Sequence, residues 1–542
     1  MKKMLPIVLV LLMLAPILAN AENTLTTEVG TYPIVNEPYE LTIWCVQPSD
    51  IEDYATNGQT VWYESYSGIH VKWVTVPSQG RYQALQLSVM SGELPDIYLI
   101  LLDNSDLDPM IEFGAIICLE DLIQSETVYM KAALEADPSL HGKAEFIDGK
   151  IYAAWQDTLN TMSTYDRLYV YKPWLDSYTE ATGFGMPQTT EEYRQMLAYF
   201  RDNDMNGNGD AADEIPMLGT SGMEGFFFLM GSFEPTPWRD TTAAIAVNDD
   251  GTVKFTANTD AFREGIRYVR SLYEENLLTE ESFVIDWTMR NSIVSVPRSD
   301  VRVGVIVADC IDNAVVLGAD DSYVNYDDYI VIPPLEGPEG VRAATFNEDH
   351  TVTYRGVITS ACEHPEIAIR WLDYWYSDEG RQWIIRGGQE GVQWWWDEGT
   401  TINGEGKVVR QSDDYQVMHN AAWSNSVVPV IIKEEDYDTM DASQLATNAF
   451  LRNELDRRIY QKYAFYHNWP SVYTNDKEIG METGELGSNI RSVIVQAYTA
   501  FILGRADINN DADWNTYISN LNAAGLPRLL ELTNQIAKGF VK

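Results

Sequence analysis

Hydrophobic positions in the first part of the chain follow two spacings. Continuous or alternating apolar runs occupy 41–46, 69–76 and 97–102, which is the pattern of buried or half-buried strands. Between the last two runs, helical spacing groups three apolar residues on one face: Tyr82, Leu85 and Val89. Strands that alternate with helices in this way predict an α/β fold with a parallel sheet.

The most regular helical pattern lies between 189 and 202. Four apolar residues stand at i, i+3, i+4 and i+7 and form one face: Tyr193, Met196, Leu197 and Phe200. Thr189 and Glu192 have the spacing of a capping box at the start of this helix. We therefore expect a helix that leads directly into the acidic loop that follows it.

The same patterns predict further strands and helices later in the chain. The run 301–308 is typical of a strand that ends at Asp309, and 356–359 of another strand. Pro365 is placed to open a helix. We expect the residues after about 396 to be mostly helical.

The loop at 202–214 carries five acidic residues, three asparagines and two glycines. Acids this close repel one another unless a cation neutralises them, and alternating oxygen ligands around a glycine suit Ca²⁺. One register begins at Asp202 and places Gly207 sixth and Asp213 twelfth. The other begins at Asp204 and uses these candidate ligands: Asp204, Asn206, Asn208, Asp210, Asp213 and Glu214. A solvated turn without a metal is the alternative interpretation.

A second acidic ladder consists of Asp507, Asn509, Asp511 and Asp513. It lacks a glycine at the sixth position, where Ala512 stands, and an acid at the twelfth. We interpret it as the cap of a following helix.

Residues 1–21 have the pattern of a signal peptide. Lys2 and Lys3 precede an apolar run, and Ala19-Asn20-Ala21 is a small-x-small cleavage site. We expect an exported protein that is periplasmic or extracellular and associated with the cell surface. The residue after the cleavage site is not cysteine, so the sequence does not show the lipobox that lipid attachment requires.

The formal net charge of −44 disfavours nucleic acid and anionic membranes as partners. Aromatic residues make up 12% of the chain, which indicates a folded protein because acidic disordered chains are poor in them. The four cysteines at 45, 118, 310 and 362 are too few and too scattered for a disulfide scaffold. One or two disulfides and free thiols both remain open.

Several phrases occur in a fixed order along the chain: SGIHVKW, MSGELPDIYLI, FGAIICLEDLI, FIDGKIYAAW and, near the end, FILGRADINNDADWNTYISNLNAAGL. In this order the chain resembles the extracellular solute-binding proteins (family 1) of ABC transporters. The large oligosaccharide-binding branch, which includes alginate-binding and lipoprotein-type sugar-binding proteins, is the most similar.

The resemblance implies an α/β, two-lobe periplasmic-binding-protein fold (type II) with hinge crossings and a ligand cleft between the lobes. The expected N-terminal lobe is 22–160 with 353–395, and the expected C-terminal lobe is 161–350 with 396–542. The resemblance also implies a monomer that captures a carbohydrate and delivers it to the permease subunits of an ABC importer. We expect this carbohydrate to be an oligosaccharide. Relatives that bind acidic polysaccharides carry a structural calcium in a loop like 204–214. Three residues instead of two precede the Asp-Glu-Ile-Pro ending here, which leaves the ligand register open.

Aromatic and polar residues near turns and strand ends are candidates for contact with a sugar, because indoles stack on its C–H faces while polar groups bind its hydroxyls. By position these are Gln47, Asp103, Trp155, Asp157, Trp238, Arg239, Asp309, Trp394, Trp395 and Trp396. For any one of them core packing is the alternative. Three consecutive indoles cannot all face one core, so we expect the triplet at 394–396 to present at least one ring to a cleft or interface.

An enzyme is not expected, and no residue is assigned a catalytic role. The chain lacks the GxSxG, HExxH, Walker and CxxC patterns. A secreted carbohydrate-active hydrolase remains the alternative, because a pair of facing carboxylates has no sequence signature among 81 acids.

Overall fold

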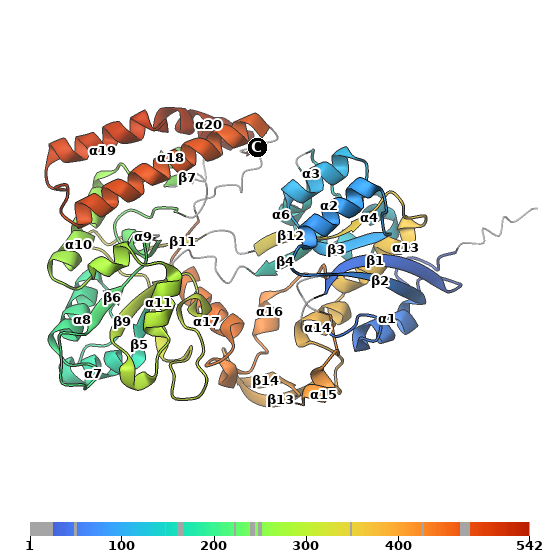
Figure 1. The fold of residues 1–542 in the computed structure, drawn as a ribbon, viewed down its shortest axis with the longest axis horizontal. Coiled ribbons are helices and arrows are strands. Elements are labelled where there is room, and N and C mark those ends of the chain that lie inside the picture. The colour runs from blue at the N-terminus through green and yellow to red at the C-terminus, as the bar shows by residue number, and fades with distance from the viewer. Residues whose placement is uncertain are drawn as a thin grey trace, which may run out of the picture.

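The computed structural model describes residues 25–540 except 48–50, 147, 160–166, 222–223, 239–243, 248–251, 347–349, 413, 424–427 and 467–476. The predicted signal peptide therefore lies outside the described residues. The chain forms two lobes, each built on its own sheet (Figure 1). The buried residues form separate clusters in the two lobes, so each lobe has its own hydrophobic core.

The first lobe is organised around a sheet with the order β2-β1-β3-β12-β4. Its strands are β1 (Tyr39–Gln47), β2 (Ile69–Pro77), β3 (Ile97–Leu102), β4 (Ala154–Leu159) and β12 (His350–Ile358). The pairs β1–β2 and β1–β3 are parallel, which confirms the predicted parallel α/β core. The later strand β12 lies antiparallel to both β3 and β4, so a segment from far along the chain completes this sheet.

Helices surround the first sheet (Figure 1). They are α1 (Gly58–Ser67), α2 (Arg81–Ser91), α3 (Asn104–Glu112), α4 (Glu120–Glu126), α5 (Tyr129–Ala136), α6 (Pro138–Ala144), α13 (Pro365–Asp373) and α14 (Asp378–Arg386). Pro365 occupies the first turn of α13, as expected. Trp371 and Trp375 are fully buried beneath these helices.

The second lobe contains a sheet with the order β10-β5-β9-β6. Its strands are β5 (Arg167–Tyr171), β6 (Ile215–Leu218), β9 (Val303–Ala308) and β10 (Tyr329–Ile332), and two short pairs flank it: β7 (Ile245–Val247) with β8 (Val253–Phe255), and β11 (Ala344–Phe346) with β15 (Ala464–Tyr466). Around them lie α7 (Lys172–Thr182), α8 (Thr190–Asp202), α9 (Glu224–Met230), α10 (Asp260–Glu274), α11 (Trp287–Val294), α12 (Ile311–Ala314) and α17 (Ala449–Gln461).

Helix α8 has the predicted bounds and the predicted buried face. Thr189 Oγ1 accepts a hydrogen bond of 3.1 Å from the Glu192 N–H. The Glu192 carboxylate accepts its bond from the N–H of Gln188. The first half of the capping box is thus present, and the second half is displaced by one residue.

Three helices close the chain along the top of the second lobe in Figure 1. They are α18 (Lys477–Ile502), α19 (Asp511–Ala523) and α20 (Leu526–Phe540). Their apolar faces join the core of that lobe, where Tyr498, Phe501 and Tyr517 are buried. No helix among the described residues is long and apolar enough to span a membrane.

The segment between the lobes differs from the mostly helical prediction. It contains the hairpin β13 (Trp394–Thr401) and β14 (Gly404–Gln411), followed by two short helices, α15 (Tyr415–Met418) and α16 (Glu434–Tyr437). Trp423, Val428 and Val430 belong to the core of the first lobe, although the prediction assigned residues after 396 to the second. The chain therefore returns to the first lobe before it enters α17.

Candidate functional site

In each sheet, the carboxyl ends of the central strands lie next to a chain crossing that joins the lobes. Strand β12 enters the first lobe directly after 347–349 and runs antiparallel to β3, with Tyr354 opposite Leu102. The carboxyl ends of β1 and β3 therefore lie at the crossing end of the first sheet. In the second sheet, Arg167 at the start of β5 is opposite Ala308 at the end of β9, so that end also lies at a crossing.

Four of the predicted polar residues lie on the strands that reach these crossings. Gln47 is the last residue of β1, Asp103 follows β3, Asp157 is in β4 and Asp309 follows β9. The topology thus places each of them at or near the end of its own sheet that is next to a chain crossing. Sheet ends of this kind are the usual ligand sites of open α/β folds.

Asp103 and Asp309 are held by local hydrogen bonds. The Asp103 carboxylate caps α3 and accepts bonds from the N–H groups of Ser105 and Asp106. The hydroxyl of Ser105 also donates to it, and this bond lowers the pKa of Asp103. Asp309 is buried and accepts bonds from the Cys310 N–H and from Asn313 Nδ2, both of 2.9 Å.

Gln47 and Asp157 are also anchored to nearby backbone. The amide of Gln47 donates to the carbonyl of Ile51. Asp157 is buried, and its backbone N–H and carbonyl bond with Val430 and Ile432, at 2.8 Å each. The segment that contains Val430 thereby covers the free edge of β4.

Arg355 is a polar residue near this edge that the candidate set did not include. Its Nε donates to Gln156 Oε1 over 2.7 Å. Burial lowers the pKa of Arg355 to about 10. The pairing joins β12 to β4, and the sequence carried no local signal for it because the two residues are about two hundred positions apart.

The tryptophan triplet lies in β13. Trp394 is buried and donates from its indole to the carbonyl of Gly388 over 2.9 Å. Trp395 and Trp396 are 43% and 40% exposed. Because strand side chains alternate, Trp394 and Trp396 share one face and meet edge to face with centroids 5.8 Å apart. Two of the three indoles therefore reach solvent at the junction between the lobes.

Two other predicted aromatic residues lie inside the cores. Trp155 has no exposed surface and packs in the first lobe. Trp238 is 1% exposed, stacks on Phe227 at 3.8 Å between centroids and lies under the guanidinium of Arg491. Neither offers a free ring face to a ligand in this structure. Arg239 lies outside the described residues.

The acidic loop after α8 is folded around Asp204 and Glu214. Asp204 Oδ1 accepts bonds from the N–H groups of Gly207 and Asn208, and Oδ2 accepts one from Gly209. Glu214 Oε1 accepts the N–H of Met205 over 2.8 Å, whereas Glu214 Oε2 is buried and has no hydrogen-bond partner. Burial raises the pKa of Glu214.

The remaining candidate ligands form a chain of side-chain to backbone bonds. Asn206 and Asn208 each accept the N–H two residues ahead, and both amides donate to Asp213. Asp210 accepts the N–H of Ala212. Within the described residues, no three His, Cys, Asp or Glu side chains are grouped closely enough to hold a metal ion.

Asp202 does not take part in this loop. Its carboxylate pairs with Arg201 at 2.7 Å, and that hydrogen bond lowers the pKa of Asp202. The pairing favours the register that begins at Asp204.

The second acidic ladder contacts arginines. Arg263 Nη1 lies 2.8 Å from Asp511, and Arg267 Nε donates to Asn509. Asn510 caps α19 by accepting the N–H of Ala512. These contacts agree with the interpretation of the ladder as a helix cap.

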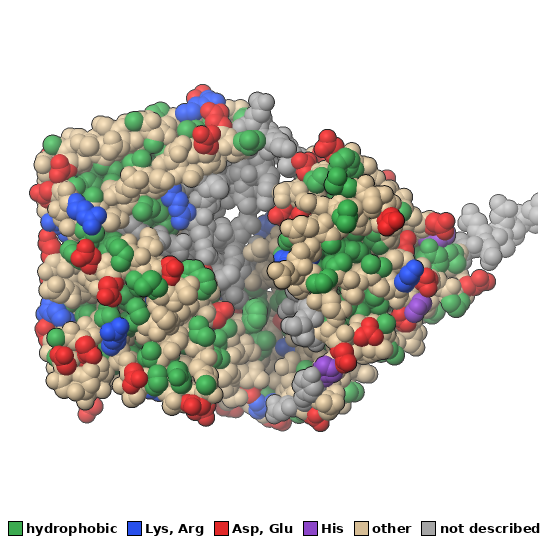
Figure 2. Space-filling view, in the orientation of Figure 1, with side chains coloured by type: hydrophobic (Ala, Val, Ile, Leu, Met, Phe, Trp, Pro, Cys, Tyr) green, Lys and Arg blue, Asp and Glu red, His purple; other side chains and the backbone are tan. Residues whose placement is uncertain are grey.

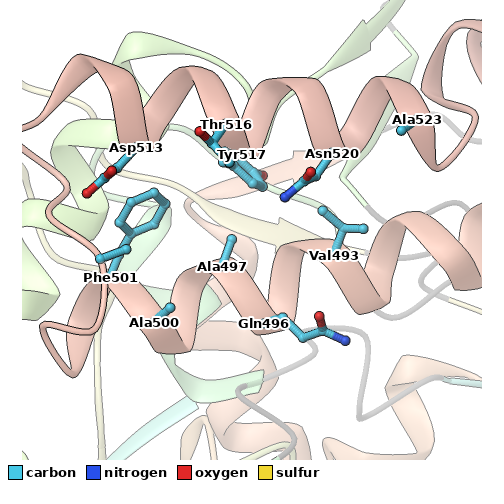
Figure 3. A pocket seen from close by; sticks show the side chains of 11 residues that line it. Val493, Gln496, Ala497, Ala500, Phe501, Asp513, Thr516, Tyr517, Asn520 and Ala523 are labelled. Atoms are coloured by element: carbon cyan, nitrogen blue, oxygen red, sulfur yellow. The ribbon is translucent and has the colours of Figure 1, made fainter.

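A groove of about 480 Å³ lies between α18 and α19 (Figure 3). Phe501 and Tyr517 line it together with the amide side chains of Gln496 and Asn520. All its lining residues come from the last fifty positions of the chain, and none of the predicted ligand-binding residues is among them. We therefore place the candidate site at the lobe junction instead.

Charged side chains are dispersed over the surface. Figure 2 shows Asp and Glu scattered over both lobes with Lys and Arg between them, and no continuous basic patch among the described residues on this face. This distribution does not provide the basic surface that nucleic acids require.

Comparisons with known proteins bear on the two-lobe architecture. No family model matches the chain. The chain is 32% identical over 324 residues to the fructooligosaccharide ABC transporter substrate-binding protein FusA of Streptococcus pneumoniae serotype 4. That match covers 58% of this chain and 56% of FusA, so the chain spans about half the length of this curated relative.

Solved structures extend the likeness to nearly the whole chain. An extracellular solute-binding protein from Bifidobacterium longum subsp. infantis has a TM-score of 0.68 at 18% identity, over 94% of this chain and all of that chain. S. pneumoniae FusA in complex with kestose has a TM-score of 0.62 at 23% identity, over 92% of this chain and 99% of that one. The chain therefore shares the fold of these solved extracellular solute-binding proteins. The predicted two-lobe α/β fold is thereby confirmed.

Two further structures concern the acidic loop. One is a FusA EF-hand mutant in complex with fructo-nystose, with a TM-score of 0.62 at 22% identity over 92% of this chain and 99% of that one. The other is the alginate-binding protein AlgQ2 without calcium ion, with a TM-score of 0.54 at 18% identity over 94% of this chain and all of that one. An EF-hand and a calcium ion are thus named for proteins of this fold.

Proposed function

We propose that this protein is the exported substrate-binding component of an ABC importer and captures an oligosaccharide between its lobes. The observation that supports the proposal is that Gln47, Asp103, Asp157 and Asp309 lie in or directly after strands that run to the chain crossings between the lobes. The relative with 32% identity is named as a fructooligosaccharide-binding protein, which supports the ligand class. The permease of the importer is the partner to which the ligand is delivered.

The proposed site combines two kinds of contact. The carboxylates accept hydrogen bonds from sugar hydroxyls, and the Gln47 amide both donates and accepts. Trp395 and Trp396 stack on sugar faces. A ligand that touches both lobes binds the closed arrangement more strongly than the open one. This difference in affinity is what drives the lobes together.

The proposal includes the predicted processing and division of the chain. Residues 1–21 act as the signal peptide, and the crossings near 160 and 350 separate the lobes. The last crossing lies after 432, since Val428 and Val430 support the first lobe.

We also propose a structural calcium in the acidic loop. Its oxygen donors are Asp204, Asn206, Asn208, Asp210, Asp213 and Glu214. The buried Glu214 Oε2, which lacks a hydrogen-bond partner, fits a group that meets a cation. A bound calcium supplies positive charge among these acids, and the loop residues then fix the end of α8 against the start of β6.

A thermal-shift screen of residues 22–542 against fructans, human-milk-type, N-glycan and uronate oligosaccharides tests the proposal. A saturable rise in melting temperature with one sugar class, with the sugar recovered intact by chromatography, is the expected result. The failure of every sugar class to bind in calorimetry, or the appearance of cleavage products, would overturn it. Buffer without any sugar serves as the blank. Glycerol serves as the control for non-specific stabilisation.

A further inference from the structure

The short helix α16 connects the two lobes and is contacted by charged groups of both. It follows the segment that covers β4 and precedes α17, the helix that packs on the second sheet. Three consecutive acids form its first turn, Glu434, Glu435 and Asp436, and Asp438 follows it. Arginines from both lobes contact these acids.

The contacts to the first lobe are buried. Arg381 of α14 lies 2.5 Å from Asp436, and the side chains of the two residues are 7% and 3% exposed. Arg386, also of α14, donates to the carbonyl of Asp436 over 3.2 Å and to Thr439 over 2.6 Å. Removing water from a charge pair makes it insensitive to salt and costly to break. We expect α16 to move with the first lobe.

The contacts to the second lobe are more exposed. Arg458 of α17 lies 2.7 Å from Asp438 and 3.5 Å from Glu434, whose side chains are 39% and 50% exposed. Arg457 reaches Glu434 at 3.4 Å. Both arginines also bind Glu454, which is fully buried in α17. Pairs with half-exposed partners are weak and screened by salt.

This asymmetry leads to a specific role. We propose that α16 is an electrostatic hinge in which the Arg458 pairs with Asp438 and Glu434 form the releasable contact that sets the orientation of the lobes. The Arg381–Asp436 pair keeps α16 fixed on the first lobe, and rotation of the second lobe breaks the Arg458 contacts first. Arg458 retains Glu454 as a partner after release, so no buried charge is left unpaired.

The hairpin of the tryptophan triplet is tied to the same hinge. Asn403 at its turn donates to Asp438 over 2.8 Å and accepts a bond from Arg458 over 3.2 Å. Rotation at Arg458 therefore also shifts the contacts of the hairpin that carries Trp395 and Trp396. The inference rests on the proposed function only in assuming that the lobes move relative to each other.

The test measures the distance between the lobes without any ligand. Spin labels are placed at Leu87 in α2 and Met289 in α11, which are 70% and 53% exposed, after Cys118→Ser and Cys362→Ser remove the accessible thiols. Pulsed electron resonance then compares the unsubstituted hinge with Arg458→Gln and with Asp438→Asn. Arg528→Gln is the matched control, because this variant loses the same charge, and the ion pairs of Arg528 among the described residues are with Glu482 and Glu531 of the second lobe.

The two hinge variants are expected to change the ratio of lobe orientations about two- to fivefold each, the effect of losing one exposed ion pair. Raising NaCl from about 0.02 M to about 0.5 M should move the unsubstituted protein toward the variants, because the Debye length falls several-fold. Unchanged distances in both variants, or an equal change in Arg528→Gln, would overturn the hinge. Because no sugar is present, this outcome is independent of whether the proposed ligand binds.

Discussion

Asp373 Oδ1 accepts a hydrogen bond of 2.7 Å from the backbone N–H of Met130, and this contact joins the end of α13 to the start of α5. The same buried carboxylate also accepts the N–H groups of Val128 and Tyr129. These bonds satisfy donors at a helix start that have no partner within the helix. One side chain thus fixes the relation of two helices that are far apart in the sequence.

The substitution Asp373→Asn should destabilise the first lobe by about 1–3 kcal/mol, because the amide replaces one acceptor by a donor that faces buried N–H groups. Urea denaturation followed by tryptophan fluorescence measures the change. Asp176→Asn is the control, since Asp176 is exposed and its ion pair within the described part of the chain is with Lys172. A loss no larger than in the control would contradict the role assigned to Asp373.

The effect of Asp373→Asn should also depend on pH. Burial raises the pKa of Asp373 above its usual value of 3.8, so the folded state binds the proton more tightly than the unfolded state does. The native protein therefore gains stability relative to the variant as the pH falls through the folded pKa toward 3.8. Denaturation curves at several pH values should show a larger difference at acidic than at neutral pH, and an equal difference at both would be evidence against the raised pKa.

The core of the second lobe gives a second prediction. A Cβ at Gly304 in β9 would lie 2.6 Å from Phe200 and 2.8 Å from Trp174, both of them buried. Gly304→Ala should cost about 1–3 kcal/mol because the core is already filled. Gly185→Ala, where a Cβ meets nothing within 4 Å, is the control. Equal melting temperatures for the two variants would show that the core can adjust.

The strands of the first sheet and helix α8 were predictable because their apolar spacing is set by burial on one or both faces. The runs at 41–46, 69–76 and 97–102 lie within β1, β2 and β3. The two-lobe architecture was available only through the family resemblance. The spacing of apolar residues predicts which side chains are buried. It does not predict which of the two lobes contains them.

The aromatic candidates show where residue type stops being informative. Trp155 and Trp238 fill cores, whereas Trp395 and Trp396 reach solvent, and all four have the same side chain. A large ring serves equally well in a core and against a sugar. The Asn403-Gly404 dipeptide at the turn was the local signal for the hairpin.

The apolar run at 427–432 was a strand-like signal that the prediction did not use. Its partner is the edge of β4, more than 250 positions earlier, so the pairing could not be read locally. The hinge contacts of Arg381 and Arg458 are of the same kind. In a chain with 81 acids, the partner of a given arginine is decided by the fold.

Calcium binding should depend on Glu214. We expect EDTA to lower the melting temperature of the native protein and CaCl₂ to restore it, since a ligand that binds only the folded state stabilises it. Glu214→Gln should remove most of this response. Asp202→Asn should retain it, because Asp202 pairs with Arg201 outside the loop. An unchanged response in Glu214→Gln, measured by calorimetry with a calcium-free baseline, would place the ion elsewhere.

Sugar binding should depend on the exposed indoles of the hairpin. Trp395→Ala and Trp396→Ala remove ring faces that are already 43% and 40% exposed, so each should lower stability little. If either ring stacks on the ligand, its loss should weaken binding by about 5- to 30-fold, the effect of removing an aromatic contact worth about 1–2 kcal/mol. Calorimetric titration with the sugar identified in the screen measures this.

Trp287→Ala provides the matched comparison for these variants. Trp287 is 63% exposed at the start of α11, and it lies outside the hairpin and outside the set of predicted ligand contacts. Its loss should leave the affinity unchanged, whereas Trp395→Ala or Trp396→Ala should reduce it. Because strand alternation directs Trp395 and Trp396 to opposite faces, we expect one of the two to dominate. Full affinity in both variants would restrict the sugar contacts to the sheet ends at Asp103, Asp157 and Asp309.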